Sequence, residues 1–387
     1  DNEVDQNPSN VEESAANGTS AGGSGEGQPS GASEDESSEE TNKEDVPTEE
    51  ETTPEEKKTT SSEEVGTQEG EGENAVALSD YITVNNGEMQ YDTLEAAIAA
   101  AVPENGVITY TVHGSVHVET DGWIEIVKSG LTDITKVEFV GASENAEIST
   151  DAKHSILNEQ TYGVDVIFDN LTLSHPNGEW VGNTGHGAVY FTTWVHDSSK
   201  TVTYTNCKFP NGACNNQYGK TVYDNCKFTN GTSGLYNLWN YGGNTEIKGS
   251  TFTGVRGIKT YNEGTLNVAP TVKIENTSFT GLTEKAAVVA SKATDITFDC
   301  VTTTDCTKGT FQKDIEGSSD EEKVAITANG TGISGSFNVT AEKNVEAAKE
   351  EFNISAGSFT GLSAAETETL KGYLAPNTEI SADGTVS

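Results

Sequence analysis

Apolar positions in the middle of the chain follow a repeated spacing of two, three and two residues. In the stretch Thr221–Phe228 (TVYDNCKF), the positions that share this spacing are Thr221, Tyr223, Cys226 and Phe228. Strand side chains alternate between two faces, so a step of three breaks the alternation once. We therefore predict two short strands joined by a bend, with both strands turning these positions inward.

Five further stretches repeat this pattern. The six copies are Val166–Leu173, Val202–Phe209, Thr221–Phe228, Thr245–Phe252, Val272–Phe279 and Ile296–Thr303. Asn or Gly occupies the bend in five of them, and both residues tolerate the left-handed backbone conformation. An aromatic residue or leucine ends five copies, and Thr303 ends the sixth. The copies lie 19 to 36 residues apart, and such periods are typical of a stacked β-solenoid.

This pattern resembles the right-handed parallel β-helix of the pectin-lyase-like superfamily, including its asparagine ladder at the tight bend. The order of residues from Tyr91 to Val107 is similar to the lead-in of β-helix surface proteins of Gram-positive gut bacteria. The resemblance implies an all-β fold, a right-handed parallel β-helix solenoid over roughly residues 105–360. It says little about activity, because one fold serves many functions.

The remaining segments suggest caps and a tail. We expect a strand at Tyr81–Val84 and a helix at Asp92–Ala101 capped by Asp92, which together cover the first coil. Second strands are expected at Ala188–Phe191, Ala213–Asn215, Leu235–Trp239, Ile258–Tyr261 and Ala286–Ala290. Helices are expected at Ala341–Glu350 and Ser363–Leu374. The predicted domains are an acidic spacer (1–75), an N-terminal cap (76–106), the β-helix (107–340) and C-terminal rungs with a cap (341–387).

Composition predicts a disordered N-terminal segment and excludes some classes of partner. The first 75 residues are rich in Ser, Glu and Gly and have almost no large apolar residues, so we expect them to be disordered. The formal net charge is −40, and Arg256 is the single arginine. This balance argues against nucleic acid and anionic lipid as partners. No run of 18 apolar residues exists, and the start at Asp1 suggests a processed chain, so we expect an extracellular protein, secreted or attached to the bacterial cell wall.

Five cysteines do not form a recognisable framework. Cys207 and Cys226 fall at the same place in consecutive copies, within reach of a disulfide if the coils stack. We favour buried thiols stacked as small hydrophobic groups.

Candidate catalytic motifs are incomplete. Gly185–Gly187 (GHG) and Arg256–Lys259 (RGIK) are similar to two motifs of the polygalacturonases, but the pair of carboxylates that this family needs is missing from the solenoid. A lyase would need a calcium-binding acidic cluster and a basic residue, and no tight cluster is present. We expect no cofactor and no metal, and keep a polysaccharide lyase or glycoside hydrolase as the alternative reading.

Aromatic residues provide the better functional signal. Aromatic side chains and asparagines crowd one third of the chain, and such groups hold sugars and anchor protein partners. The predicted ligand-binding residues are Trp180, His186, Trp194, Tyr236, Trp239, Tyr241, Arg256 and Tyr261. The opposite reading, that some of these aromatics are core, stays open.

The sequence thus predicts a non-catalytic, adhesin-like surface protein that binds a host glycan or a host protein, with mucin or an immunoglobulin as examples. We expect a monomer that inserts into no membrane. A passive stalk remains the third possibility.

Overall fold

The computed structural model describes residues 79–119, 123–151, 157–159, 161–176, 190–261, 270–291, 294–313, 324–335, 339–341, 352–354, 357–358, 363–372 and 374–387. The acidic segment 1–75, the loop that contains Trp180 and His186, and most of the helix expected at 341–350 lie outside these residues.

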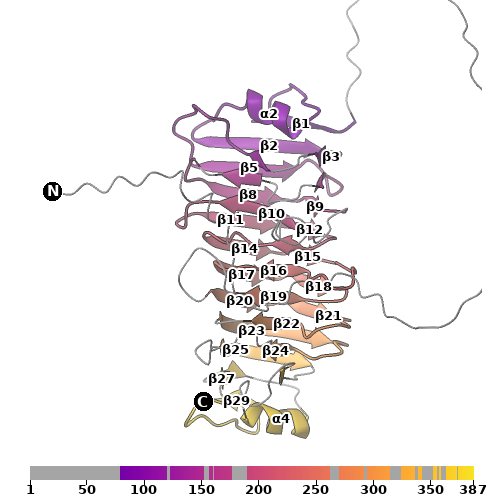
Figure 1. Cartoon of the computed structure of the whole chain (residues 1–387), viewed down its shortest axis with the longest axis vertical. Coiled ribbons are helices and arrows are strands. Elements are labelled where there is room, and N and C mark those ends of the chain that lie inside the picture. Colours follow the sequence, from indigo (N-terminus) through magenta and orange to yellow (C-terminus); the bar gives the residue numbers. More distant parts are fainter. Residues whose placement is uncertain are drawn as a thin grey trace, which may run out of the picture. The chain divides into compact units, whose positions relative to one another are not determined.

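Successive coils of the chain stack to form a right-handed parallel β-helix (Figure 1). Each regular coil contributes one strand to each of three columns of strands. The first column consists of β2 (Val107–His113), β5 (Lys136–Gly141), β8 (Asp165–Asp169), β11 (Thr201–Thr205), β14 (Lys220–Asp224), β17 (Asn244–Lys248), β20 (Thr271–Glu275), β23 (Thr294–Thr304), β25 (Val324–Gly335) and β27 (Phe352–Ile354). The second column, across the bend, consists of β3 (Ser115–Val118), β6 (Glu147–Thr150), β9 (Thr172–Ser174), β12 (Lys208–Phe209), β15 (Lys227–Phe228), β18 (Thr251–Thr253), β21 (Ser278–Thr280) and the later parts of β23 and β25.

The third column is a separate nine-stranded parallel sheet, called here the second sheet. Its strands are β4 (Ile124–Glu125), β7 (Leu157–Glu159), β10 (Phe191–Val195), β13 (Ala213–Cys214), β16 (Leu238–Asn240), β19 (Ile258–Tyr261), β22 (Val288–Ser291), β24 (Phe311–Lys313) and β26 (Val339–Ala341). All five expected second strands are present in the expected order, as β10, β13, β16, β19 and β22. Three of them begin two or three residues later than expected, β10 at Phe191, β16 at Leu238 and β22 at Val288.

The bend that joins the first two columns has the predicted left-handed conformation. Its residues have φ between 46° and 56° in all six copies: Asn170, Asn206, Asn225, Gly249, Asn276 and Cys300. The backbone N–H of Asn206 donates to the carbonyl of Asp224 in the next coil, at 2.9 Å, and Asn225 repeats this bond to Lys248. Side-chain bonds are less regular than a continuous ladder, because Asn206 donates to Asp169 and Gly249 has no amide to offer.

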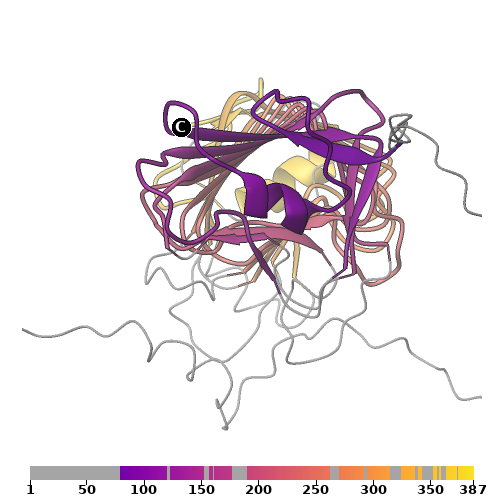
Figure 2. The ribbon, with the colours of Figure 1, turned by 90° about the horizontal axis from the view of Figure 1, so that it is seen from above.

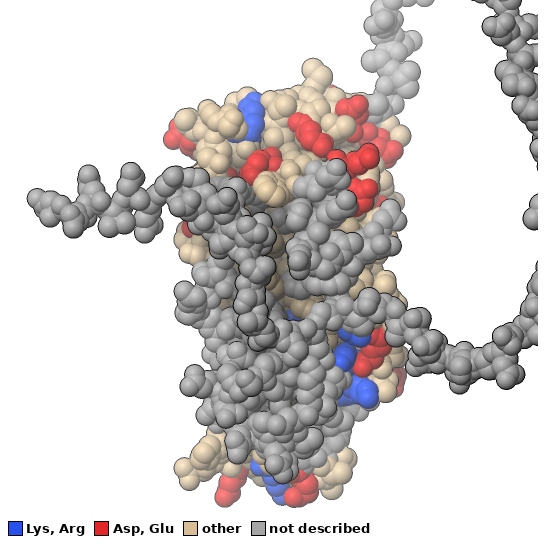
Figure 3. Space-filling view, viewed as in Figure 1, with Lys and Arg blue, Asp and Glu red and all other residues tan. Residues whose placement is uncertain are grey.

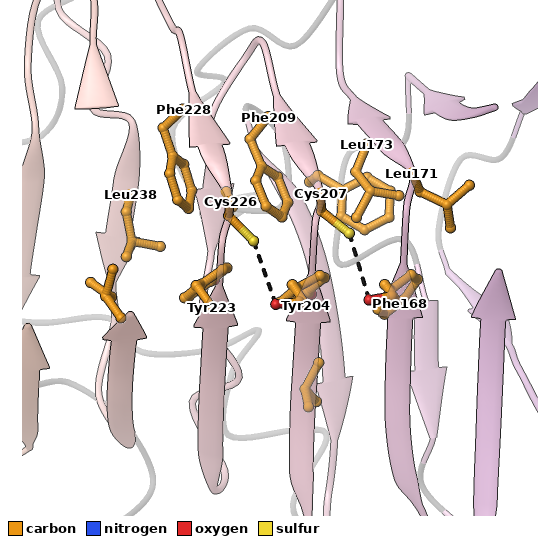
Figure 4. Packing of buried hydrophobic residues seen from close by; sticks show 14 of the residues in the cluster. Phe168, Leu171, Leu173, Tyr204, Cys207, Phe209, Tyr223, Cys226, Phe228 and Leu238 are labelled. Atoms are coloured by element: carbon orange, nitrogen blue, oxygen red, sulfur yellow. Dashed lines mark hydrogen bonds between the residues drawn. The ribbon is translucent and has the colours of Figure 1, made fainter. Parts of the chain in front are cut away.

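Two stacks of aromatic rings fill the solenoid (Figure 4). In the first column, Tyr204 lies between Phe168 and Tyr223, with ring centroids 4.9 and 5.0 Å apart. In the second column, Phe209, Phe228, Phe252 and Phe279 stack at centroid distances of 4.8, 4.3 and 4.7 Å. Thr303 replaces the aromatic residue in the last copy, and its hydroxyl bonds to that of Thr310. Inward alternation therefore places one large residue per coil in each stack, and this residue is aromatic in consecutive coils over much of the solenoid.

Cysteines line the inner side of the bend as free thiols. The Sγ atoms of Cys207 and Cys226 point to the carbonyls of Phe168 and Tyr204 in the preceding coil (Figure 4). All five cysteines are free, as favoured from the sequence.

Both ends of the stack are covered. Strand β1 (Tyr81–Val84) pairs antiparallel with β2, and helix α2 (Leu94–Ala100) lies across the end of the coils when seen from above (Figure 2). The N-cap of α2 is Thr93, which accepts a bond from Ala96 N, so the expectation that Asp92 caps this helix was wrong. At the other end lie helix α4 (Ala364–Lys371), close to the range expected for a closing helix, and the pair β28 (Gly357–Ser358) and β29 (Thr385–Val386). Neither described helix is long and apolar enough to cross a membrane.

Candidate binding face on the second sheet

The outward side of the second sheet gathers most of the predicted ligand-binding residues. Leu238 and Ile258 belong to the main core, so their strand neighbours Trp239 and Lys259 lie on the opposite face. The register places Trp239 next to Cys214 in one coil and Lys259 in the other. Alternation puts Trp194 on this same face, because the next residue, Val195, and Phe191, three residues earlier, both belong to the core.

The face divides into a buried and an accessible part. The buried part, here called the inner cluster, consists of Tyr190, Cys214, Tyr236, Trp239 and Val289, with Leu235 and Tyr241 packed against it. Tyr236 and Trp239 are only 2% and 4% exposed, which corrects the expectation that they form part of an exposed patch. Their ring centroids lie 5.7 Å apart in an edge-to-face contact. Each ring therefore shields part of the other from solvent, on the face of the sheet that points away from the solenoid core.

Two cations flank the inner cluster. The guanidinium of Arg256 lies over the ring of Tyr236, with Cζ 5.2 Å from the centroid, and Nζ of Lys259 lies 6.0 Å from the centroid of the Trp239 ring. Both distances are in the range of cation–π attraction. Burial of Tyr190 raises the pKa of its hydroxyl above the usual range. This hydroxyl therefore stays protonated, and the inner cluster contains no phenolate charge.

Arg256 is held by a carboxylate from the next coil. Its Nε donates to Oε2 of Glu284 at 2.6 Å, and Glu284 also accepts bonds from Ser233 Oγ at 2.6 Å and Gly234 N at 3.0 Å. Desolvation acts to raise the pKa of Glu284, but these hydrogen bonds and the Arg256 charge outweigh it and lower the pKa below its ordinary value. Sequence reasoning missed Glu284, although it lies in the turn that precedes β22, just as Arg256 lies in the turn that precedes β19.

The accessible part, here called the aromatic platform, consists of Trp194, His196 and Tyr218. The imidazole of His196 stacks on the ring of Tyr218 at 3.9 Å, and Trp194 meets Tyr218 edge to face at 5.9 Å. Trp194 and Tyr218 are half-buried, and His196 is exposed. Contact with neighbouring groups desolvates His196 and lowers its pKa, so the ring is neutral at pH 7.

Sequence reasoning found Trp194 but missed its two partners in the platform. Tyr218 lies in the turn after β13, and His196 directly follows β10, so only the stacking of two coils brings them together. Tyr261 closes β19, and its side chain lies outside the described residues, as do Trp180 and His186. Of the remaining predicted residues, Trp194 belongs to the platform, Tyr236, Trp239 and Tyr241 belong to the inner cluster or pack against it, and Arg256 flanks it.

Within the described ranges, His, Cys, Asp and Glu side chains form no group of three or more that could hold a metal ion. No family model, no curated protein and no solved structure matches the chain.

Proposed function

We propose that the chain is a non-catalytic, adhesin-like binding protein of a bacterial cell surface, and that it holds a host glycan on the outward face of its second sheet. The aromatic platform carries this proposal. It presents two aromatic rings and a neutral imidazole from neighbouring coils at the surface. Sugar rings offer C–H faces that pack on aromatic rings and hydroxyls that hydrogen-bond to polar groups nearby.

A polar group beside the platform supports a carbohydrate ligand. Asp197 follows His196 in the chain, and bonds from the hydroxyl and the N–H of Ser199 lower the pKa of its carboxyl. An ionised carboxylate next to aromatic rings is a suitable acceptor for sugar hydroxyls.

We favour a glycan over a host protein such as an immunoglobulin. Protein interfaces depend on a few large apolar or aromatic anchors at the centre of an extended contact. The exposed large hydrophobic side chains of the described residues are Met89, Val102 and Trp123, and all three belong to the N-terminal cap and the first coil. The platform therefore offers too little apolar surface for a typical protein partner.

Binding of the full chain to an array of mucin-type glycans tests the proposal. Trp194→Ala and Tyr218→Ala should each weaken binding about 5- to 100-fold, because each removes one ring of the platform. Trp123→Ala is the control, since it removes a tryptophan that is 44% exposed from the N-terminal part, away from the platform. If wild type and Trp194→Ala bind the glycans with equal affinity, the platform is not part of the binding site. Release of new sugar ends from a bound polysaccharide would instead favour the lyase or hydrolase reading.

A further inference from the structure

Tyr241 lies in line with the aromatic platform on the outward face of the second sheet. The register aligns Thr192 with Cys214, and Cys214 with Trp239, on this face. Two residues further along the chain, Trp194 and Tyr241 therefore occupy one outward row, two coils apart. Cys214 and Trp239 lie in the neighbouring row and not between these two positions. At the usual spacing of strands the separation is about 10 Å along the stack.

Two consecutive buried asparagines of the intervening coil hold the backbone on either side of them. Oδ1 of Asn216 accepts bonds from the N–H groups of Val195 and Tyr218, both at 3.3 Å. Oδ1 of Asn215 accepts from the N–H of Tyr241 at 2.7 Å, and its Nδ2 donates to the carbonyl of the following residue. Asn215 and Asn216 are positioning residues that fix two tyrosines on different coils, so little backbone freedom is lost when a ligand binds both.

Tyr241 remains partly accessible although it packs against the inner cluster. The residue is half-buried, whereas Tyr236 and Trp239 of the same coil are almost completely buried. Trp194 and Tyr218 of the platform are half-buried in the same way. A ring that is packed on one side and partly exposed on the other can contact the apolar face of a sugar. Tyr241 therefore offers a second aromatic contact in the row of the platform.

Charge favours a neutral ligand here. The formal net charge is −40, and Figure 3 shows acidic side chains gathered on the N-terminal part of the described surface. Beside the platform, desolvation raises the pKa of Glu159, and the charges of Glu125 and Asp197 raise it further. Lys200 offsets part of this negative charge, since it lowers the pKa of Asp197 together with bonds from Ser199. An anionic sugar would be repelled by such a surface.

We propose that the platform and Tyr241 together bind a linear, neutral oligosaccharide that is longer than a disaccharide and runs along the stack. This inference rests on the proposed function, because it assumes that a glycan lies on the platform. Trp194 and Tyr218 hold one part of the sugar chain, and Tyr241 packs against a sugar further along. A separation of about 10 Å exceeds the span of one sugar ring, so only a longer chain makes both contacts.

Isothermal titration of the full chain with N-acetyllactosamine and with a linear tetrasaccharide of two such units tests the proposal. Wild type should bind the tetrasaccharide about tenfold more tightly, which is more than the doubling that a second identical unit gives. Tyr241→Leu keeps an apolar side chain against the inner cluster but removes the ring. This variant should lose the tenfold gain and bind the disaccharide as wild type does.

Two variants serve as controls. Tyr241→Phe keeps the ring and should keep the gain, and so should Tyr81→Leu, which removes a half-buried tyrosine from the N-terminal cap. A sialylated form of the tetrasaccharide should bind more weakly than the neutral one, and tighter binding would overturn the neutral preference.

The outcomes separate this inference from the proposed function. No gain beyond doubling in wild type, or a gain that survives in Tyr241→Leu, would overturn the contact at Tyr241 while the platform stands. If Trp194→Ala binds both sugars as wild type does, or if wild type binds neither, the proposed function and this inference fall together.

Discussion

Asn225 donates a hydrogen bond from Nδ2 to Oδ1 of Asn206 in the preceding coil, at 2.7 Å. Both residues have a left-handed backbone, with φ of 53° and 54°, at the bend between the first two columns. The same residue type thus supplies a rare backbone conformation and a bond along the stack, whereas glycine at the equivalent position 249 supplies only the conformation.

Substitutions at Asn225 separate these two contributions. Asn225→Gly should lower the free energy of unfolding by about 1 kcal/mol, because it loses the amide bond but keeps the left-handed backbone. Asn225→Ala should cost about 1–2 kcal/mol more, because alanine is strained in that conformation. Urea unfolding measures both values. Equal stability of the two variants would mean that backbone strain plays no part at this bend.

A double-mutant cycle measures the pairing of Arg256 with Glu284. We expect a coupling energy of about 1–2 kcal/mol, since charged hydrogen bonds are strong but both side chains retain some contact with solvent. The pair Lys273–Glu275, in which the lysine side chain is 46% exposed, is the control and should give a clearly smaller coupling energy. Similar coupling in the two pairs would show that burial of Arg256 adds nothing.

Acid should weaken the fold through Glu284. The folded protein lowers the pKa of this carboxyl below its ordinary value of 4.5, so the folded state binds the proton less readily than the unfolded state. The stabilisation is therefore complete above that pH and is lost as the pH falls through the folded pKa. The difference in unfolding free energy between wild type and Glu284→Gln should shrink from pH 6 towards pH 3. If the difference in unfolding free energy stays constant over this pH range, the pKa of Glu284 is not lowered by folding.

Thiol titration tests the state of the cysteines. Cys207, Cys214, Cys226 and Cys306 are buried, and burial raises the pKa of Cys207 and Cys306, so these thiols should resist Ellman's reagent in the native protein. The half-buried Cys300 should react, and Cys300→Ser should abolish the reaction. In urea without reductant, all five thiols should react. Reaction of only three thiols per chain would reveal a disulfide bond between the other two cysteines.

The repeated spacing determined the fold of this protein. Apolar positions such as Tyr223 and Phe228 recur in each copy at the same place, and a step of three with Asn or Gly allows one arrangement that buries them all. Short-range chemistry of this kind is readable from sequence because the bend conformation and the alternation of side chains depend on neighbouring residues. The cap residue of α2 was harder to predict, because Asp92 and Thr93 are both good caps and only the helix start distinguishes them.

Tertiary structure alone decided which aromatic residues of the second sheet are accessible. Trp194 and Trp239 both point outward by alternation, yet one lies in the accessible platform and the other in the inner cluster, where Tyr190, Tyr236 and Lys259 surround it. Burial of an outward residue depends on what adjacent coils place beside it, and the neighbours Lys259 and Tyr190 are 20 and 49 residues away from Trp239 in the chain. The partners Tyr218 for Trp194 and Glu284 for Arg256 were hidden for the same reason, since loops of unequal length set the register between coils.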